Sequence, residues 1–235
     1  MNKIDELSMF LPAYNEEAVI KQTITKCNAV LAKVAKKYEI LVINDGSTDK
    51  TEQIVNKIIK TNKNVRMISH NPNKGYGGAL KTGLYNARYK YTAYIDADGQ
   101  FDLSEIDRFL PHIGKYDIVI GYRAQRADHG LRKVVALMLK IWNLVWFRFW
   151  VKDVDCAFKL WKTEIINKIP KLKTESAITE TEWMIKVKQA GFKIKEVPVG
   201  HYERIGGQST GGNLKVIARA AKDTFKLWWV LLTKQ

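Results

Sequence analysis

Residues 94–101 of this 235-residue chain read Tyr-Ile-Asp-Ala-Asp-Gly-Gln-Phe. The apolar run from Ala93 to Ile95 predicts a buried strand that ends directly in two carboxylates, Asp96 and Asp98. Alternate side chains of a strand point the same way, so both carboxylates can aim at one point beyond the strand's carboxyl end. Ligands of open α/β sheets bind at the carboxyl ends of strands. This corner is therefore the first candidate for a binding site.

The same corner is rich in oxygen ligands. Gln100 adds an amide oxygen to the two carboxylates, and hard oxygen ligands suit Mg²⁺ or Mn²⁺ and the phosphates that these ions carry. The alternative is an acidic turn before the next helix, for which Asp102 or Ser104 could be the cap. The pattern predicts a metal site at Asp96, Asp98 and Gln100, with the acidic turn as its alternative.

Length and composition limit the classes of protein to consider. A chain of 235 residues with 46% hydrophobic residues can form one large domain, or one domain with an appendage. Its formal net charge of +15 favours an anionic partner, such as a lipid surface, a phosphorylated substrate or nucleic acid. No zinc-finger or RNA-binding signature accompanies the charge, so we expect no nucleic-acid partner. Two cysteines, Cys27 and Cys156, and the lack of a signal-peptide pattern predict a protein of the reducing cytosol.

Strand and helix patterns alternate along the chain. Such alternation predicts βαβ units and a mainly parallel sheet, the α/β class. Pro12 is expected to end the first strand, Asn15 to cap the first helix, and Ser47 or Thr48 to cap the second. The predicted strands cover residues 7–11, 39–44, 65–69, 93–95, 117–120, a stretch ending at 161, and 193–197, and the main predicted helices include 15–36, 103–112 and 178–190.

Residues 73–78, Asn-Lys-Gly-Tyr-Gly-Gly, form a glycine-rich loop that leads into a helix. This loop matches neither the dinucleotide fingerprint nor the P-loop. Two interpretations stay open: the loop cradles a phosphate, or its glycines let the helix pack closely.

Residues 131–150 have a different character, with large apolar side chains interrupted only by basic residues. These interruptions make the segment a poor membrane span, which needs about 20 apolar residues in a row. Trp142, Trp146 and Trp150 recur at every fourth position and predict one helical stripe. An aromatic stripe flanked by cations is typical of a helix in the bilayer interface, and the alternative is a helix packed on the protein's own core. A predicted basic helix at 214–232 ends in Leu-Trp-Trp-Val-Leu-Leu and is a second candidate anchor.

Four stretches together resemble glycosyltransferase family 2. Within that family they look most like the branch of dolichyl-phosphate mannose synthases and polyprenyl-phosphate glycosyltransferases. The segment 182–209, with Arg204, Gly207 and Ser209 in an Arg-x-x-Gly-x-Ser pattern, extends the similarity nearly to the C-terminus. The four stretches are Phe-Leu-Pro-Ala-Tyr-Asn-Glu-Glu at 10–17, Ile-Asn-Asp-Gly-Ser-Thr-Asp at 43–49, Asp-Ala-Asp-Gly-Gln at 96–100 and Asp-Val-Asp-Cys-Ala-Phe at 153–158.

The resemblance implies a GT-A fold, which is Rossmann-like, as a single domain over residues 1–235. Residues 1–122 would form the nucleotide-sugar-binding half, residues 123–212 the acceptor-side half, and residues 213–235 an amphipathic helix. It also implies a GDP- or UDP-sugar donor, Mg²⁺ or Mn²⁺, and inversion at the anomeric carbon. The implied metal and diphosphate residues are Asp96, Asp98 and Gln100. The residues implied to contact the nucleotide sugar are Pro12, Ala13, Tyr14, Glu16, Asp45, Lys74, Asp96 and Ala97.

The implied catalytic groups depend on the acceptor. Arg123 and Arg204 are the cations expected near the donor phosphate or the acceptor, and Asp155 aligns with a family aspartate beside the reaction centre. A lipid phosphate is already ionised and needs little help from a base, whereas a sugar hydroxyl needs one, which Asp155 or Glu182 would supply. For Glu182 the alternative is a carboxylate that the helix dipole favours in a first turn. Two departures leave the acceptor open: Thr210 stands where the mannose synthases usually carry lysine, and the sequence shows no appended transmembrane helices.

The leading hypothesis is an inverting, metal-dependent glycosyltransferase that acts on polyprenyl phosphate. It would bind peripherally to an anionic surface on the cytoplasmic face of a membrane. One alternative transfers the sugar to a hydroxyl of a glycan or glycolipid. Another is an inactive, basic, membrane-binding module that keeps the fold, although the presence of all four carboxylates at 45, 96, 98 and 155 argues against it.

Overall fold

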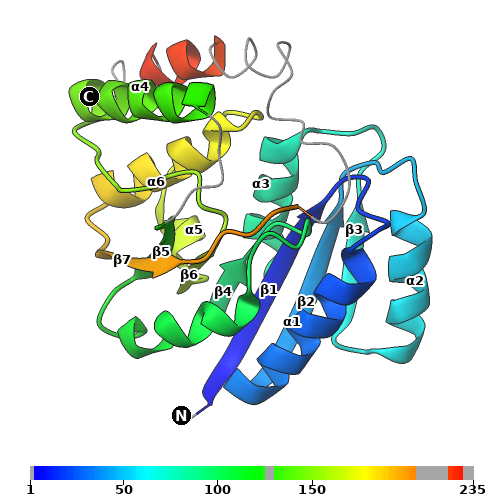
Figure 1. Ribbon diagram of the computed structural model, residues 1–235. Coiled ribbons are helices and arrows are strands. Elements are labelled where there is room, and N and C mark those ends of the chain that lie inside the picture. The colour runs from blue at the N-terminus through cyan, green and yellow to red at the C-terminus, as the bar shows by residue number, and fades with distance from the viewer. Residues whose placement is uncertain (1–2, 125–129, 205–221, 230–235) are drawn as a thin grey trace.

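The computed structural model describes residues 3–124, 130–204 and 222–229 (Figure 1). Within these residues a seven-stranded sheet has the order β3-β2-β1-β4-β6-β5-β7. Its strands are β1 (Ile4–Ala13), β2 (Ala35–Asn44), β3 (Val65–Ser69), β4 (Tyr91–Tyr94), β5 (Ile118–Arg123), β6 (Lys159–Lys162) and β7 (Ile194–Val199). The α-helices are α1 (Ile20–Val34), α2 (Thr51–Thr61), α3 (Tyr76–Asn86), α4 (Gly130–Phe147), α5 (Ile165–Lys168) and α6 (Ile178–Gln189), and residues 222–229 are also helical.

The sheet is parallel except for one strand. β1 pairs in parallel with β2 and β4, β2 with β3, and β5 with β7, whereas β6 runs antiparallel to both β4 and β5. The predicted mainly parallel sheet is therefore confirmed. The reversal has a direct consequence: the residues that precede β6 lie at the same edge as the carboxyl ends of β1, β2 and β4.

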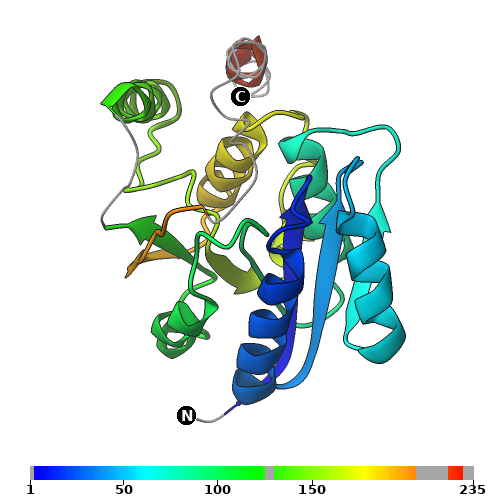
Figure 2. The same cartoon turned by 45° about the vertical axis from the view of Figure 1, so that its right-hand side comes forward.

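Helices cover both faces of the sheet, α1 and α2 on one face and α3 and α6 on the other (Figures 1 and 2). Successive side chains of a strand point to opposite faces. In β1, Met9 and Leu11 accordingly pack on the α1 side, while Phe10 packs on the α3 side. Phe10 lies so close to α3 that a Cβ at Gly83 would be 2.3 Å from its ring.

The glycines of the 73–78 loop serve close packing. A Cβ at Gly77 would lie 2.3 Å from Thr179 Oγ1 of α6 and 2.4 Å from Ser176 O, so only glycine lets the start of α3 approach the start of α6 this closely. Gly75 has a φ of 80°, a conformation that favours glycine. The structure thus supports the packing interpretation at these positions.

Several predicted boundaries and caps are wrong. Pro12 lies inside β1, and the carbonyl oxygen of Pro12 accepts a hydrogen bond from Ala97 N. Asn15 does not cap α1, which begins at Ile20, because Asn15 has a φ of 56° and its side chain instead accepts from Thr48 N. The first turn of α2 is bound by Asp49, whose Oδ1 accepts from Thr51 N, and not by Ser47 or Thr48.

The region after β4 also differs from the prediction. Residues 103–112 form two short 3-10 helices, Leu103–Arg108 and Leu110–His112, in place of one α-helix. Asp102 caps the first of them, with its side chain accepting from Ser104 N. Because Asp102 provides the cap, the two carboxylates at 96 and 98 are not needed for it.

The tryptophan-rich segment forms α4, which packs against the helical residues 222–229. The Trp142 and Phe225 ring centroids are 5.5 Å apart, and those of Trp146 and Trp228 are 5.2 Å apart. Trp150 lies beyond the end of α4, so the predicted three-residue stripe holds only for Trp142 and Trp146. In the part of the chain that is described, no helix combines the length and the apolar character that crossing a bilayer requires. The other residues of the predicted helix 214–232, and Gly207, Ser209 and Thr210, lie outside the described residues.

Candidate active site

The ends of three neighbouring strands are joined by backbone hydrogen bonds. Asp45 N donates to Ala13 O at 2.9 Å, which ties the residue after β2 to the end of β1. Ala97 N donates to Pro12 O at 3.2 Å, which ties the residues after β4 to β1 from the other side. Parallel pairing therefore brings together the predicted donor residues that follow β1, β2 and β4.

The loops after β1 and β2 hold one another in place. Asn15 N donates to Ser47 Oγ at 3.0 Å, and Glu16 N donates to Thr51 Oγ1 at 2.8 Å. Tyr14 precedes these contacts, and 39% of its surface stays exposed. The arrangement fixes the Glu16 backbone while leaving the Tyr14 ring available at the edge.

The carboxylate of Asp45 is buried and held from two sides. Its Oδ1 accepts from Lys74 N at 2.9 Å and lies 2.6 Å from His70 Nδ1. His70 Nε2 is in turn 2.9 Å from Thr82 Oγ1 on α3. Lys74 thus contributes its backbone to this contact while its side chain is exposed, and His70 is a neighbour that the sequence did not point out.

Arg204 links the loop after β1 to the turn after β4. Its guanidinium contacts the Glu16 carboxylate, and its Nη1 lies 3.5 Å from Asp98 Oδ2. Gln100 holds this segment, since Gln100 Nε2 donates to Tyr202 O at 3.0 Å and Tyr202 N donates back to Gln100 O at 2.9 Å. The Gln100 amide group therefore serves to place Arg204 beside the acidic corner.

The acidic corner holds oxygen atoms that the described protein does not satisfy. One oxygen of Asp96 and one of Glu16 are buried without a hydrogen-bond partner in the described part of the chain, whereas buried polar atoms are nearly always bonded. Burial and the charges of Asp98 and Glu180 hold the pKa of Asp96 well above its usual range. Burial, together with the charges of Asp98 and Asp49, also raises the pKa of Glu16 to about 7, although Arg204 opposes the shift. This corner would be stabilised by a bound cation.

The corner fits a divalent cation that its substrate also coordinates. The described residues contain no group of three or more histidine, cysteine, aspartate or glutamate side chains placed to hold a metal. Two carboxylates, Asp96 and Asp98, are nevertheless enough for the sites in which Mg²⁺ is completed by substrate phosphates and water. The donor set therefore suits an ion that arrives with a diphosphate.

A second layer of charged residues lies beside this corner. Arg123, at the end of β5, binds Asp153 through Nε at 2.6 Å and Nη2 at 2.8 Å. Asp155 is exposed, yet the protein atoms packed around it and the charges of Glu180 and Asp153 raise its pKa to about 6. Arg123 is thus engaged with Asp153 and supports the turn that carries Asp155.

Glu180, and not Glu182, faces the site. Two residues along an α-helix are separated by about 200°, so these neighbours point in nearly opposite directions. Glu180 contacts Lys159 and Tyr94 Oη, and its charge acts on both Asp96 and Asp155. Glu182 is fully buried, and its oxygens accept hydrogen bonds from Lys173 N, Thr174 N, Thr174 Oγ1 and Lys186 Nζ. This geometry fits a structural carboxylate, and we assign Glu182 no part in the chemistry.

Tyr76, the first residue of α3, also belongs to the site. Its side chain interacts with Asp96, Glu180 and Asp155, and burial and these acidic neighbours hold its pKa well above its usual range. A hydrogen bond from Tyr76 opposes the raised pKa of Asp96. Nothing in the sequence pattern distinguishes this tyrosine from the glycines around it.

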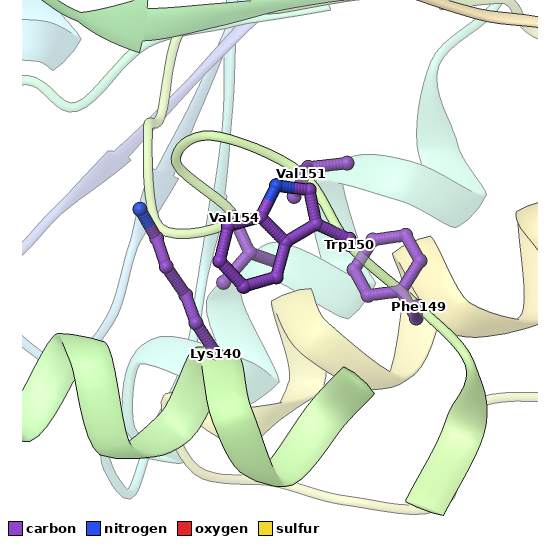
Figure 3. Close-up of a pocket in the computed structure, with 5 residues that line it drawn as sticks. All are labelled: Lys140, Phe149, Trp150, Val151 and Val154. Atoms are coloured by element: carbon purple, nitrogen blue, oxygen red, sulfur yellow. The ribbon is translucent and has the colours of Figure 1, made fainter. Parts of the chain in front are cut away.

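A small pocket lies between α4 and the segment that follows it. It is lined by Lys140 of α4 and by Phe149, Trp150, Val151 and Val154 of the following segment (Figure 3). Lys140 Nζ lies 5.9 Å from the centroid of the Trp150 ring. The pocket volume of about 10 Å³ is close to the minimum for one water molecule.

Comparison with solved structures gives the class of the fold. The chain superposes on mannosyl-3-phosphoglycerate synthase from Rubrobacter xylanophilus with a TM-score of 0.73 and 19% identity, over 97% of this chain and 74% of the other. It superposes on glucosyl-3-phosphoglycerate synthase from Mycobacterium tuberculosis, solved with Mn²⁺, uridine diphosphate and glucosyl-3-phosphoglycerate, with a TM-score of 0.69 and 18% identity, over 95% and 78%. The fold is the GT-A fold that the sequence predicted.

Sequence comparison gives the family. The model of glycosyl transferase family 2 matches residues 8–171. Dolichyl-phosphate beta-glucosyltransferase from Saccharomyces cerevisiae is 30% identical over 231 residues, covering 86% of this chain and 68% of the yeast protein. The Dictyostelium discoideum protein of the same name is 31% identical over 232 residues, covering 88% and 70%. The chain belongs to glycosyl transferase family 2 and is a nucleotide-sugar-dependent glycosyltransferase, and its resemblance to the polyprenyl-phosphate branch is confirmed.

The raised pKa of Glu16 predicts a dependence of stability on pH. The folded protein holds a proton on Glu16 up to a pH of about 7, whereas the ordinary pKa is 4.5. Between these values the folded state binds more protons than the unfolded state, so this group makes stability fall as pH rises. We expect Glu16→Gln to remove that fall and to raise the melting temperature at pH 7.5 by roughly 3 °C.

The control for this prediction is Glu203→Gln, which changes an exposed carboxylate beside Arg204. Melting curves of both variants and the wild type between pH 4.5 and 8 test the effect. Parallel curves for Glu16→Gln and the wild type would show that Glu16 does not titrate in this range.

Proposed function

We propose that this glycosyltransferase transfers a sugar to polyprenyl phosphate, working as a peripheral protein on the cytoplasmic face of a membrane. The names of the two relatives favour this acceptor and favour glucose as the sugar. The observation that carries the donor chemistry is the acidic corner, where Glu16, Asp98 and Arg204 meet and one oxygen of Asp96 is buried and unsatisfied.

The nucleotide sugar would lie along the carboxyl ends of β1, β2 and β4. Asp45 is the group we assign to the nucleoside, because His70 and Lys74 N fix its carboxylate at the end of β2. Tyr14 would cover the nucleoside from the edge. The remaining donor contacts would come from the backbone and side chains of Pro12, Ala13, Glu16, Lys74, Asp96 and Ala97.

Mg²⁺ or Mn²⁺ would be held by Asp96 and Asp98. When bound, such an ion offsets the charge of the diphosphate leaving group. The solved glucosyl-3-phosphoglycerate synthase contains Mn²⁺, but at 18% identity that likeness supports the fold alone. The proposal therefore rests on the two carboxylates, and we give Gln100 the role of holding the Arg204 segment beside them.

The reaction would be a single displacement with inversion. An oxygen of the acceptor phosphate forms a bond to the anomeric carbon as the bond from that carbon to the diphosphate breaks, and the electron pair leaves with the diphosphate. The attacking oxygen is already ionised, so no proton has to be removed. Arg204 would stabilise the charge that develops on the leaving group. Asp155 would orient the sugar or the acceptor, on the turn that Arg123 supports through Asp153.

An aromatic and aliphatic ridge on α4 and residues 222–229 would contact the membrane. In Figures 1 and 2, α4 and the helical residues 222–229 lie toward the end of the molecule to which β1 and β2 point. Trp142 and Trp228 are half-buried and join the two helices, so for them the core-packing interpretation holds in part. The exposed apolar residues of the ridge are Leu137, Met138, Ile141, Leu144, Val145, Trp146, Phe225 and Trp229. Such a ridge beside basic residues is typical of a surface in the bilayer interface.

The acceptor can be tested directly. The purified protein, Mg²⁺ or Mn²⁺ and a panel of UDP- and GDP-sugars are incubated with dolichyl or undecaprenyl phosphate, and the lipid product is identified by mass. We expect the lipid phosphate to gain one sugar.

Asp98→Asn should lower the rate roughly a hundredfold through lost electrostatic stabilisation, while Asp107→Asn, an exposed neighbour, should not. Transfer to a sugar hydroxyl in place of the lipid phosphate would contradict the acceptor, and full activity in a chelator would contradict the metal.

Asp45 should contribute to donor binding more than to chemistry. Asp45→Asn keeps hydrogen-bond acceptance from His70 and Lys74 but removes the charge, and lost hydrogen bonds to charged groups weaken binding by roughly tenfold or more. Calorimetry with the nucleoside diphosphate should show this loss, with a smaller effect on the maximal rate. The control is Asp117→Asn, which lies before β5 and therefore at the opposite edge of the sheet. Equal affinities of Asp45→Asn and the wild type would remove Asp45 from the nucleoside site.

Membrane binding should depend on the exposed ridge. Met138→Gln with Val145→Gln removes two side chains that are 65% and 63% exposed. At about 1 kcal/mol each, their loss should weaken binding to anionic vesicles roughly thirtyfold, measured by flotation. The control, Lys57→Gln with Lys60→Gln, removes two charges from exposed positions of α2. A wild-type protein that does not float with the vesicles would exclude the membrane site.

A further inference from the structure

Lys159 donates hydrogen bonds to the turn that carries Asp155. This lysine is fully buried at the start of β6. Its Nζ donates to Val154 O at 2.9 Å and to Cys156 O at 2.5 Å. These two carbonyl groups lie on either side of Asp155, so one ammonium group holds the backbone before and after that residue.

The same ammonium group connects the turn to the acidic corner. Lys159 Nζ also contacts the carboxylate of Glu180 on α6, and Glu180 accepts a hydrogen bond from Tyr94 Oη. Tyr94 is the register partner of Lys159 across the antiparallel pair of β4 and β6, and it stands two residues before Asp96. A continuous set of polar contacts thus runs from the Asp155 turn to β4, the strand that leads into Asp96 and Asp98.

Stability alone does not account for the buried ion pair of Lys159 and Glu180. A buried ion pair costs the desolvation of both charges, and apolar residues of similar volume often replace such a pair without loss of stability. The lysine fixes three acceptors in place, which apolar residues could not do, because only a donor of several hydrogen bonds can hold two carbonyls and a carboxylate at once.

We propose that Lys159 is a positioning residue, which sets the place of Asp155 relative to Asp96 and Asp98 through Glu180 and Tyr94. The inference rests on the proposed function in one respect, that Asp155 acts beside the reacting groups. It predicts that removing the ammonium group loosens the turn and slows the reaction while leaving the nucleotide site intact.

Cys156 offers a probe of the turn that is independent of activity. It is fully buried, and burial raises the pKa of its thiol to about 12. Because the chain has two cysteines, a Cys27→Ala background leaves Cys156 as the single thiol. In that background we expect Lys159→Met to increase the rate of Cys156 alkylation at least roughly tenfold under native conditions, through local opening of the turn.

A matched control is available on α6, the helix that carries Glu180. Lys186 is also buried, and its Nζ binds Glu182 and Lys171 O, with no contact to the 153–158 turn among its hydrogen bonds. Lys186→Met should lower the melting temperature as Lys159→Met does, but it should leave Cys156 protected. If Lys159→Met alone does not fold, Lys159→Met with Glu180→Leu removes both charges and takes its place.

Kinetic measurements provide a second test of the positioning role. A displacement of about 1 Å in a reacting geometry costs about a hundredfold in rate, so Lys159→Met should lower kcat by roughly that factor while nucleoside diphosphate affinity stays within about threefold. Lys159→Met combined with Asp155→Asn should be no slower than the slower single variant, because a residue that acts through another is not additive with it.

The outcomes separate the two proposals. Protected Cys156 in Lys159→Met, equal exposure in Lys186→Met, or additive losses in the double variant would each overturn the positioning role. If the wild type hydrolyses the donor but does not glycosylate polyprenyl phosphate, the acceptor proposal fails. The positioning role is then judged from the hydrolysis rates and the rate of Cys156 alkylation. If no turnover is found, the alkylation rate alone decides.

Discussion

The antiparallel pairing of β6 with β4 is the constraint on which the site depends. In a purely parallel arrangement, the residues before β6 would lie at the amino edge of the sheet, far from Asp96. Reversal of one strand places Lys159 opposite Tyr94 and brings residues 153–158 to the carboxyl edge. The reversal thereby brings Asp155 to the same edge of the sheet as Asp45, Asp96 and Asp98, which parallel pairing of β1, β2 and β4 already places there.

The folded protein tolerates this concentration of carboxylates because three cationic side chains of the site, buried or partly buried, are each paired with a carboxylate. Mutual repulsion and burial would otherwise drive several of the carboxylates to bind protons. The pairing is incomplete, as the raised pKa values of Glu16, Asp96 and Asp155 show. The site therefore keeps an excess of negative potential, which suits a cation that accompanies a diphosphate. The three pairs are Arg204 with Glu16, Arg123 with Asp153, and Lys159 with Glu180.

Local pattern was enough to predict the strands and the edge of the sheet that carries the proposed donor residues, because several of these residues follow an apolar run whose end is visible in the sequence. Asp45 and Asp96 are examples. The caps were predicted less well, since Asn15 bonds to Thr48 of another loop, a contact that spacing along the chain does not reveal. Choosing between Glu180 and Glu182 required the rotation of α6 about its axis, which is set by packing against β4 and β6. The sequence pattern does not distinguish Lys159 from an ordinary strand residue, because its hydrogen-bond partners are visible only in the fold.

The size of the pocket beside Lys140 bears on how a lipid acceptor would be presented. With a volume of about 10 Å³, the pocket between α4 and residues 149–154 holds about one water molecule and no part of an isoprenoid chain. On the proposed function, an acceptor whose isoprenoid chain stays in the bilayer would need to bring only its phosphate to the edge of the sheet. Such a division requires the protein to rest on the membrane through the end that lies beside the strand termini. α4, which carries several exposed apolar side chains, lies toward that end of the molecule (Figure 1), so on the proposed function the helix that would bind the membrane and the edge that would bind the donor lie toward the same end.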